Sequence, residues 1–176
     1  MPRLIHLNGP TGVGKSTIAA RYAAEHPRTL NLDADEIVRL IGGWQDDFLG
    51  TVDLVRPLAI TMAKHHLASG HDVVMPQLVN RHDQRDLFAR AARSVGADYQ
   101  ELVLLAPAEV AVGRFRGRSH HIDGVVETLG GEALINRICG QFAAYVTPES
   151  VVIQTAGQDP GETYETMIAA LTRAVA

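Results

Sequence analysis

The chain has 176 residues, of which 46% are hydrophobic and 20% are charged. This length suffices for one α/β domain with its own core and is too short for two of ordinary size, so we expect a single domain over residues 1–176. The formal net charge of −4 gives no overall attraction for a polyanion, which argues against nucleic acid as a partner. No apolar run suits a membrane helix and no targeting signal precedes the first expected strand, so we expect a cytoplasmic protein with no membrane partner.

Apolar segments alternate with segments that have helical features along the whole chain. Strands are expected at residues 3–8, 28–33, 71–77, 99–105 and 151–154. Helices are expected at residues 15–25, 34–43, 51–69, 80–95, 108–114, 131–145 and from 159 onward. Such alternation predicts right-handed crossovers and an α/β fold with a parallel sheet that helices cover on both faces.

Several residues predict where these helices begin or bend. Asp159, with Pro160 and Glu162 after it, forms the pattern of a capping box at the start of the last helix. Asn80, with Asp83 three residues later, suggests a similar pair. Pro57 predicts either a bend in the helix at 51–69 or a later start of that helix. Residues 116–130 are rich in Gly, Arg and His and show little periodicity, so we expect a lid there.

The motif with the most specific chemistry follows the first expected strand. Residues 9–17 read GPTGVGKST and match the phosphate-binding pattern G-x-x-x-x-G-K-[ST] without departure. Backbone N–H groups of such a loop and of the following helix favour an anion, Lys15 adds a charge for the β- and γ-phosphates, and the Ser16 hydroxyl can bind Mg²⁺. The nucleotide-binding residues are therefore expected to be Gly9, Pro10, Thr11, Gly12, Val13, Gly14, Lys15, Ser16 and Thr17.

This loop occurs in switches, motors and group-transfer enzymes, so it does not name the reaction. The strand HDVVMPQ ends in Pro76 and Gln77, where a motor-type ATPase would be expected to place an acidic residue. An Asn-Lys-x-Asp sequence for reading guanine is also missing from the sequence. Both features favour a group-transfer enzyme.

Two carboxylates follow the second expected strand. Asp33 and Asp35 lie at its carboxyl end, where ligands of parallel α/β sheets bind, and alternate residues of a strand face the same side. One carboxylate could hold a metal-bound water and the other could take a proton from a substrate hydroxyl. The alternative interpretation is that one of them caps the helix that begins near Glu36.

A basic segment, GRFRGR, precedes the expected lid and contains Arg114, Arg116 and Arg118. Guanidinium groups of a closing lid can neutralise the charge that builds up on a transferring phosphoryl group and can help to exclude water. Arg114 and Arg118 are the catalytic candidates, and Arg114 is also expected to contact the nucleotide. The alternative is a solvated basic turn.

Together these features resemble the nucleoside-monophosphate-kinase-like branch of P-loop phosphotransferases, which includes shikimate kinase, gluconate kinase, chloramphenicol phosphotransferase and zeta toxins. The resemblance rests on GPTGVGKST, on the D-x-D of Asp33 and Asp35, and on GRFRGR. It implies a P-loop NTPase fold whose five-stranded parallel sheet has the order 2-3-1-4-5, Mg·ATP as donor, and a small-molecule hydroxyl as acceptor. It also implies that Asp33 serves the metal and Asp35 the acceptor, and that QTAGQDP at 154–160 is the turn near adenine. The segment MPQLVNR departs from the branch, and tunicamycin-resistance ATP-binding proteins resemble the chain in overall plan.

Residues that could recognise the acceptor lie in two segments. Trp44 and Arg56 belong to the insertion between the second and third strands, which lines the acceptor site in the branch, although ordinary packing is an equal alternative for Trp44. Gln77 and Arg81 follow the third strand at the same expected edge of the sheet. The neighbouring histidines His65-His66 and His120-His121 are not expected to form metal sites, because no i, i+4 partner completes either pair.

The sequence thus predicts an ATP-dependent kinase that phosphorylates a hydroxyl of a small molecule such as a metabolite, nucleoside or antibiotic. The catalytic candidates are Lys15, Asp35, Arg114 and Arg118, and the metal candidates are Ser16 and Asp33. The substrate candidates are Asp35, Trp44, Arg56, Gln77 and Arg81. Two alternatives stay open: a nucleotide-binding regulatory ATPase, and a kinase of a nucleotide-sugar or of a nucleic-acid end. The oligomeric state is left open.

Overall fold

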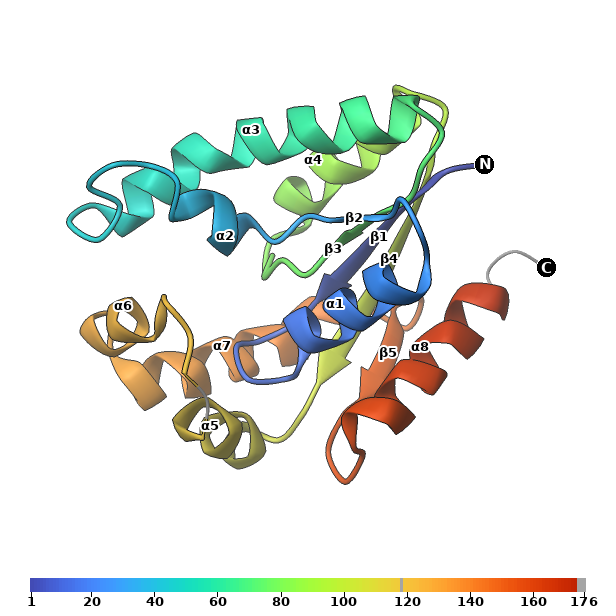
Figure 1. The fold of residues 1–176 in the computed structure, drawn as a ribbon. Coiled ribbons are helices and arrows are strands. Elements are labelled where there is room, and N and C mark those ends of the chain that lie inside the picture. Colours follow the sequence, from blue (N-terminus) through green and yellow to red (C-terminus); the bar gives the residue numbers. More distant parts are fainter. Residues whose placement is uncertain (118, 174–176) are drawn as a thin grey trace.

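A five-stranded sheet in the order β2-β3-β1-β4-β5 runs through the molecule, and every neighbouring pair of strands is parallel. The structure is a computed structural model that describes residues 1–117 and 119–173 (Figure 1). The strands are β1 (Arg3–Asn8), β2 (Leu30–Asn31), β3 (Val73–Met75), β4 (Asp98–Leu105) and β5 (Val151–Gln154). This is the expected fold, a P-loop α/β sheet flanked by helices, in the expected strand order.

Helices connect the strands in the expected alternation. They are α1 (Lys15–Glu25), α2 (Ala34–Val38), α3 (Phe48–Ala68), α4 (His82–Arg93), α5 (Ala108–Arg116), α6 (Asp123–Thr128), α7 (Gly131–Tyr145) and α8 (Pro160–Arg173). Figure 1 shows α3 and α4 together on one side of the sheet, and α1 and α8 on the other.

Alternate residues of the central strand supply the two cores that hold these layers together. Leu4 of β1 packs with the α3 and α4 layer, whereas Ile5 packs with α1 and α8, and both are fully buried. This period-2 pattern explains why the strands are apolar on both faces. Since all five strands are parallel, the residues that follow β1, β2, β3 and β5 meet at one edge of the sheet.

Of the two predicted capping pairs, one is wrong and one is confirmed. Arg81 occupies the N-cap position of α4, so the predicted Asn80–Asp83 pair is wrong: the Asn80 amide donates to Gln141 Oε1 at 2.8 Å, and Asp83 pairs with Arg81. The predicted box at α8 is confirmed, because Glu162 N–H donates to Asp159 Oδ1 at 2.8 Å and Asp159 N–H donates to Glu162 Oε2 at 2.9 Å.

The long helix α3 begins earlier than expected and continues through its proline. Asp47 caps it by accepting the N–H of Gly50 at 3.0 Å, and Pro57 lies inside the helix. A proline removes one backbone hydrogen bond, but the buried face formed by Val55, Ala59 and neighbouring residues packs against the sheet and favours one continuous helix.

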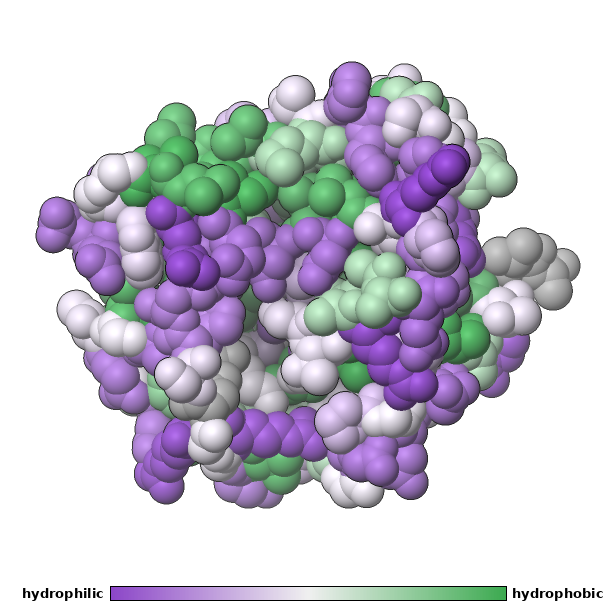
Figure 2. Space-filling view, in the orientation of Figure 1, coloured by the Kyte–Doolittle hydropathy of each residue, from purple (hydrophilic) through white to green (hydrophobic). Residues whose placement is uncertain are grey.

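The surface of α3 that faces solvent is partly apolar. Leu54 is 61% exposed, Leu58 44% and Met62 37%, at helical spacing along one stripe. Figure 2 shows apolar residues gathered over α3, while the face below it is mostly hydrophilic. Within the described residues, no helix combines the length and apolar character that crossing a bilayer would require.

The expected lid at 116–130 contains a short helix as well as loop. Arg116 ends α5 and forms an ion pair with Glu132 of α7, and residues 123–128 form α6. Val126 of α6 and Ile122 before it are buried together with Phe115 and Ile135. The lid is therefore packed on α5 and α7 in this structure. Arg118, a predicted catalytic residue, lies outside the described residues.

Candidate active site

The loop between β1 and α1 has the backbone shape of a phosphate cradle. Gly9 has φ 138° and Gly12 has φ 87°, which are values that favour glycine. A Cβ at Gly9 would also collide with the carbonyl oxygen of Leu104, and one at Gly12 with the carbonyl of Ala111. The Lys15 ammonium donates to the carbonyls of Gly9 and Pro10 at 2.8 and 2.7 Å, so the lysine side chain folds back over the loop.

Asn8, at the end of β1, ties this loop to the segment after β3. The Asn8 side chain is fully buried, and its Oδ1 accepts the N–H groups of Gly9 and Val79, each at 2.8 Å. Its Nδ2 donates to Val79 O at 2.8 Å and to Glu101 at 2.7 Å. Because all four bonds use one buried side chain, the start of the loop is fixed relative to both neighbouring strands.

A buried histidine lies beneath the same edge of the sheet. His6 Nε2 contacts the carbonyl oxygen of Gln77 at 2.9 Å, and His6 Nδ1 contacts the Tyr99 hydroxyl at 2.8 Å. A carbonyl can only accept, so Nε2 carries the proton and Nδ1 accepts from Tyr99. Burial lowers the pKa of His6 to about 4, against the opposing pull of Glu101, and burial also raises the pKa of Tyr99. The histidine is therefore neutral and positions Gln77.

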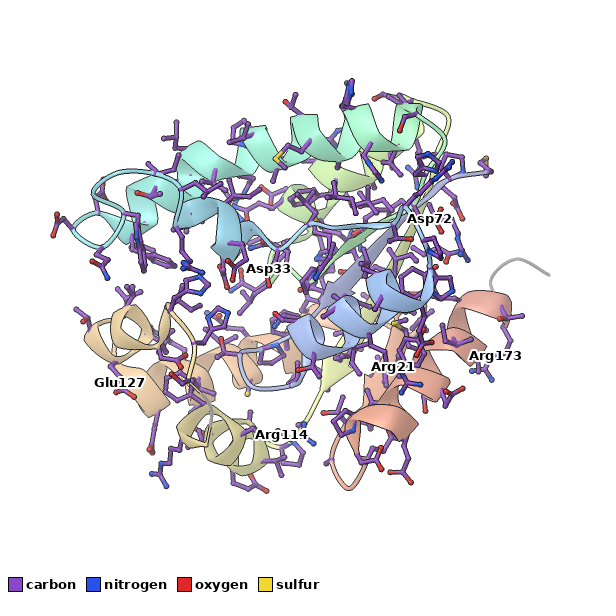
Figure 3. All side chains as sticks on the ribbon, in the orientation of Figure 1. Arg21, Asp33, Asp72, Arg114, Glu127 and Arg173 are labelled. Atoms are coloured by element: carbon purple, nitrogen blue, oxygen red, sulfur yellow. The ribbon has the colours of Figure 1, made fainter. Side chains whose placement is uncertain are left out.

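Asp33 combines the two interpretations that the sequence left open. Its Oδ1 accepts the N–H of Asp35 at 3.0 Å and so caps α2. Its Oδ2 accepts the Ser16 hydroxyl at 2.9 Å, which brings both predicted metal residues into contact. In Figure 3, Asp33 lies between α2 and the N-terminal end of α1. A carboxylate and a hydroxyl are the hard oxygen donors that Mg²⁺ prefers, so this donor set fits the ion.

Asp35 and Lys15 line one cavity of about 340 Å³, together with Ser16 and Gln77. The cavity extends from the glycine loop towards α3 on one side and towards the lid and α7 on the other. Asp35 occupies the second position of α2, directly after the capping residue Asp33 and Ala34. A carboxylate is thus placed beside the part of the loop where a terminal phosphate would bind.

A second cavity, of about 410 Å³, lies on the other side of the glycine loop. Gly12, Thr17 and Arg114 line it, together with residues of the segment from Thr155 to Thr163. The Arg114 guanidinium donates to the Thr155 hydroxyl at 2.9 Å and to the Thr155 carbonyl at 2.7 Å. Figure 3 shows Arg114 at this junction between α5 and the loop before α8. The cavity includes residues of the 154–160 turn, which the family resemblance places near adenine.

The remaining substrate candidates lie in different places. Gln77 lines the 340 Å³ cavity. Arg56 lines only a neighbouring cavity of about 20 Å³ and donates to Asp53 at 3.1 Å. Arg81 is exposed and paired with Asp83. Trp44 packs between the core under α3 and the core of the lid, which agrees with the packing alternative. Neither Trp44 nor Arg81 is among the described residues that line the cavity.

Sequence reasoning missed most of the apolar residues that line this cavity. They come from the first turns of α3, the segment after β3, the lid and α7, and include Leu49, Val52, Leu78, Ile122, Val126, Leu129, Leu134 and Ile138. Their sequence pattern is that of ordinary amphipathic helices, and only the tertiary packing turns them towards a common space.

The lid histidines also lie closer to α2 than expected. His121 Nε2 donates to the backbone carbonyl of Asp35 at 3.0 Å, and its Nδ1 lies 3.5 Å from Glu36. Glu36, His120 and His121 each offer a ligand atom within 4.8 Å of the others. The sequence argument considered only i, i+4 partners within one helix, and Glu36 approaches this histidine pair from a different element.

A larger hollow of about 650 Å³ lies away from the glycine loop. It is lined by α4 residues such as Arg85 and Arg90 and by residues before β5 such as Thr147. It contains no residue of the loop, whereas the two cavities described above do, and they form the candidate active site.

Comparison with solved structures finds the same fold in several proteins. The tunicamycin resistance protein of Deinococcus radiodurans is 20% identical, with 97% of this chain and 96% of that chain covered and a TM-score of 0.59. A gluconokinase from Sinorhizobium meliloti 1021 is 19% identical, with 98% and 93% covered and a TM-score of 0.63. The Mycobacterium tuberculosis APS kinase CysC, in complex with AMPPNP and APS, is 18% identical, with 97% and 98% covered and a TM-score of 0.69.

Comparison with curated protein sequences found no match. The fold likenesses confirm the resemblance to P-loop small-molecule kinases as a resemblance of architecture. At the level of sequence, a family model described as AAA domain matches residues 4–134, which include the glycine loop, Asp33, Asp35 and Arg114. The match covers more than half of the chain, and the chain therefore belongs to this AAA domain family.

Proposed function

We propose that the protein is an ATP-dependent phosphotransferase that moves the γ-phosphate of Mg·ATP to a hydroxyl of a small molecule. The observation that carries the proposal is that Lys15, Ser16 and Asp35 line a single cavity of about 340 Å³. Phosphoryl transfer requires a phosphate cradle and a group that orients the attacking hydroxyl, and both are next to this one space.

The donor would be held by the glycine loop. Its backbone N–H groups and Lys15 would bind the β- and γ-phosphates, while Arg114 and the Thr155 segment would surround the nucleoside on the other side of the loop. Ser16 and Asp33 would hold Mg²⁺, which when bound offsets negative charge on the phosphates. ATP is favoured over GTP by the resemblance, and the complex of CysC with AMPPNP supports an adenine nucleotide.

Asp35 would act on the acceptor. Its carboxylate orients the hydroxyl and accepts its proton while the acceptor oxygen forms a bond to the γ-phosphorus. The bond from the γ-phosphorus to the bridging oxygen breaks in the same displacement, and ADP leaves with that oxygen. Asp35 lines the cavity beside Lys15, whereas Asp33 is not among the described residues that line it, so Asp35 is the better candidate for the proton acceptor.

The neighbours in fold support this reaction class without naming the acceptor. A gluconokinase and an APS kinase share the architecture, and their acceptors differ from each other in chemistry. The acceptor here could accordingly be a metabolite, a nucleoside or an antibiotic, and the fold of a tunicamycin resistance protein keeps antibiotics among the candidates.

The test is ADP release from Mg·ATP across a panel of hydroxylated acceptors, with the Lys15→Ala variant as the blank. A signal that Lys15→Ala abolishes, together with a mass gain of one phosphate on the acceptor, is the expected result. ATP binding with no stimulation by any acceptor would contradict the proposal and would favour a regulatory nucleotide-binding role.

A further inference from the structure

We propose that the acceptor is an electrically neutral molecule with an apolar body and a hydroxyl at one end. This inference rests on the proposed kinase function and specifies its substrate class. It comes from the lining of the 340 Å³ cavity, whose polar side chains lie on the glycine loop, on α2, at Gln77 after β3 and on the lid loop.

One wall of the cavity is formed by the start of α3. Phe48, Leu49 and Val52 line it from the first turns of the helix, and Leu49 is 62% exposed to solvent. Pro76 and Leu78, on either side of Gln77, extend this apolar surface beneath α3. A ligand that covers these side chains would remove apolar surface from water, which stabilises the complex by about 25 cal/mol for each Å² buried.

The opposite wall is formed by the lid and α7. Ile122, Val126 and Leu129 come from the lid, and Leu134 and Ile138 come from α7. Ile122 and Val126 are anchored in the lid core, whereas Leu129 is 38% exposed. Two apolar walls from separate elements thus enclose the space in which the body of the acceptor would lie.

The polar groups of the cavity do not favour an anion. Among the lining residues that the structure describes, Lys15 is the only Lys or Arg side chain, and the donor phosphates need it. Asp35 adds a negative charge, while Gln77 and His120 are the other polar side chains with hydrogen-bonding atoms beyond the glycine loop. A carboxylate or phosphate on the acceptor would therefore lie beside Asp35, and none of the described lining residues offers a second Lys or Arg to pair with it, which is costly.

The size of the cavity fits a small molecule. Pockets for such ligands usually have about 300–1,000 Å³, and this one has about 340 Å³, part of which the γ-phosphate would occupy. A compact aromatic or alicyclic body therefore fits better than a large polar one such as a nucleotide-sugar.

Binding of matched pairs of compounds tests the proposal directly. One pair is 3-phenyl-1,2-propanediol and 3-phenyllactate, which share a body and a hydroxyl and differ by a carboxylate. Gluconate and glycerol serve as polar acceptors without an apolar body. Calorimetric titration into the protein loaded with Mg·AMPPNP should show the neutral diol binding at least about tenfold more tightly than its acid, because the acid buries an unpaired charge.

Two leucines of α3 give a matched pair of variants. Leu49→Lys places an ammonium at the cavity, whereas Leu54→Lys places one on the solvent face of the same helix. The two leucines are equally exposed, Leu49 at 62% and Leu54 at 61%, so they differ mainly in whether they line the cavity. Leu49→Lys should weaken binding of the diol about three- to tenfold and tighten binding of the acid. Leu54→Lys should leave both affinities unchanged.

The outcomes separate this inference from the proposed kinase function. Equal or tighter binding of 3-phenyllactate or gluconate, binding of none of the neutral compounds, or equal effects of the two lysine variants would overturn the inference. Phosphorylation of gluconate would leave the kinase function standing while overturning the inference. Selective binding of the diol without ADP release from any acceptor would support the assigned ligand class and count against the kinase function.

Discussion

The buried imidazole of His6 should make the stability of the protein depend on pH. Burial lowers the pKa of His6 from 6.5 to about 4, whereas an unfolded chain keeps the ordinary value. Below pH 6.5 the unfolded chain binds a proton at His6 while the folded protein does not. The free energy of unfolding therefore has its full value above pH 6.5 and decreases as the pH falls towards 4. At about 1.4 kcal/mol per pKa unit, the shift amounts to about 3 kcal/mol in all.

Urea unfolding followed by circular dichroism between pH 7.5 and 4.5 measures this dependence. The His6→Gln variant retains a side chain that can donate a hydrogen bond but cannot titrate, so it should lose less stability over this range than the wild type. The difference should approach about 2–3 kcal/mol at pH 4.5. His65→Gln removes an exposed histidine of α3 and should keep the wild-type slope.

Parallel pH profiles for the wild type and His6→Gln would refute the reasoning. In that case the proton would bind the folded and unfolded states equally well, and the imidazole could not be the neutral, buried partner of Tyr99 and Gln77. The comparison uses slopes, so a uniform loss of stability in the variant does not affect the conclusion.

Other predictions concern the loop, the last helix and catalysis. Gly9→Ala should destabilise the fold by at least about 2 kcal/mol in thermal or urea unfolding, because Gly9 has a positive φ and a Cβ there would collide with the Leu104 carbonyl oxygen. Gly42→Ala has open space around the added Cβ and should be tolerated. Equal losses of stability in the two variants would contradict this prediction. Asp159→Ala should cost about 1 kcal/mol in urea unfolding by removing the cap of α8, and an unchanged midpoint would show that the box contributes nothing. Lys15→Ala should lower kcat/KM for ATP about 10²- to 10³-fold in the ADP-release assay, and a change below tenfold would remove Lys15 from the phosphate site.

Local sequence signals predicted the sheet and the phosphate loop well because the relevant interactions are local. The loop needs glycines and Lys15 next to a strand and a helix, and the cap of α8 uses Asp159 and Glu162, three residues apart. Of the two alternatives that Pro57 left open, the later start of α3 does not occur, because the buried face stabilises the helix as a whole.

The apolar part of the cavity, where we propose that the acceptor binds, was harder to predict because it depends on contacts between distant segments. Leu49 and Leu129 belong to separate helical regions, and nothing in their local patterns shows that both face the same cavity. Trp44 attracted attention as the only tryptophan, yet it packs between two cores instead of lining the cavity. Asp33 and Asp35 were predicted as site residues because ligands of parallel sheets bind at the carboxyl ends of strands, and Asp33 contacts Ser16 while Asp35 lines the cavity.

The central claim is that Asp35 handles the acceptor hydroxyl beside a nucleotide held by the glycine loop. The most direct measurement compares phosphoryl transfer to an active acceptor, followed by mass spectrometry of the product, between the wild type and Asp35→Asn. Asp46→Asn, an exposed carboxylate outside the cavity, is the control. The account predicts that Asp35→Asn lowers kcat about 10²- to 10⁴-fold while ATP binding is retained, and that Asp46→Asn has no effect. Unchanged turnover in Asp35→Asn would contradict the account.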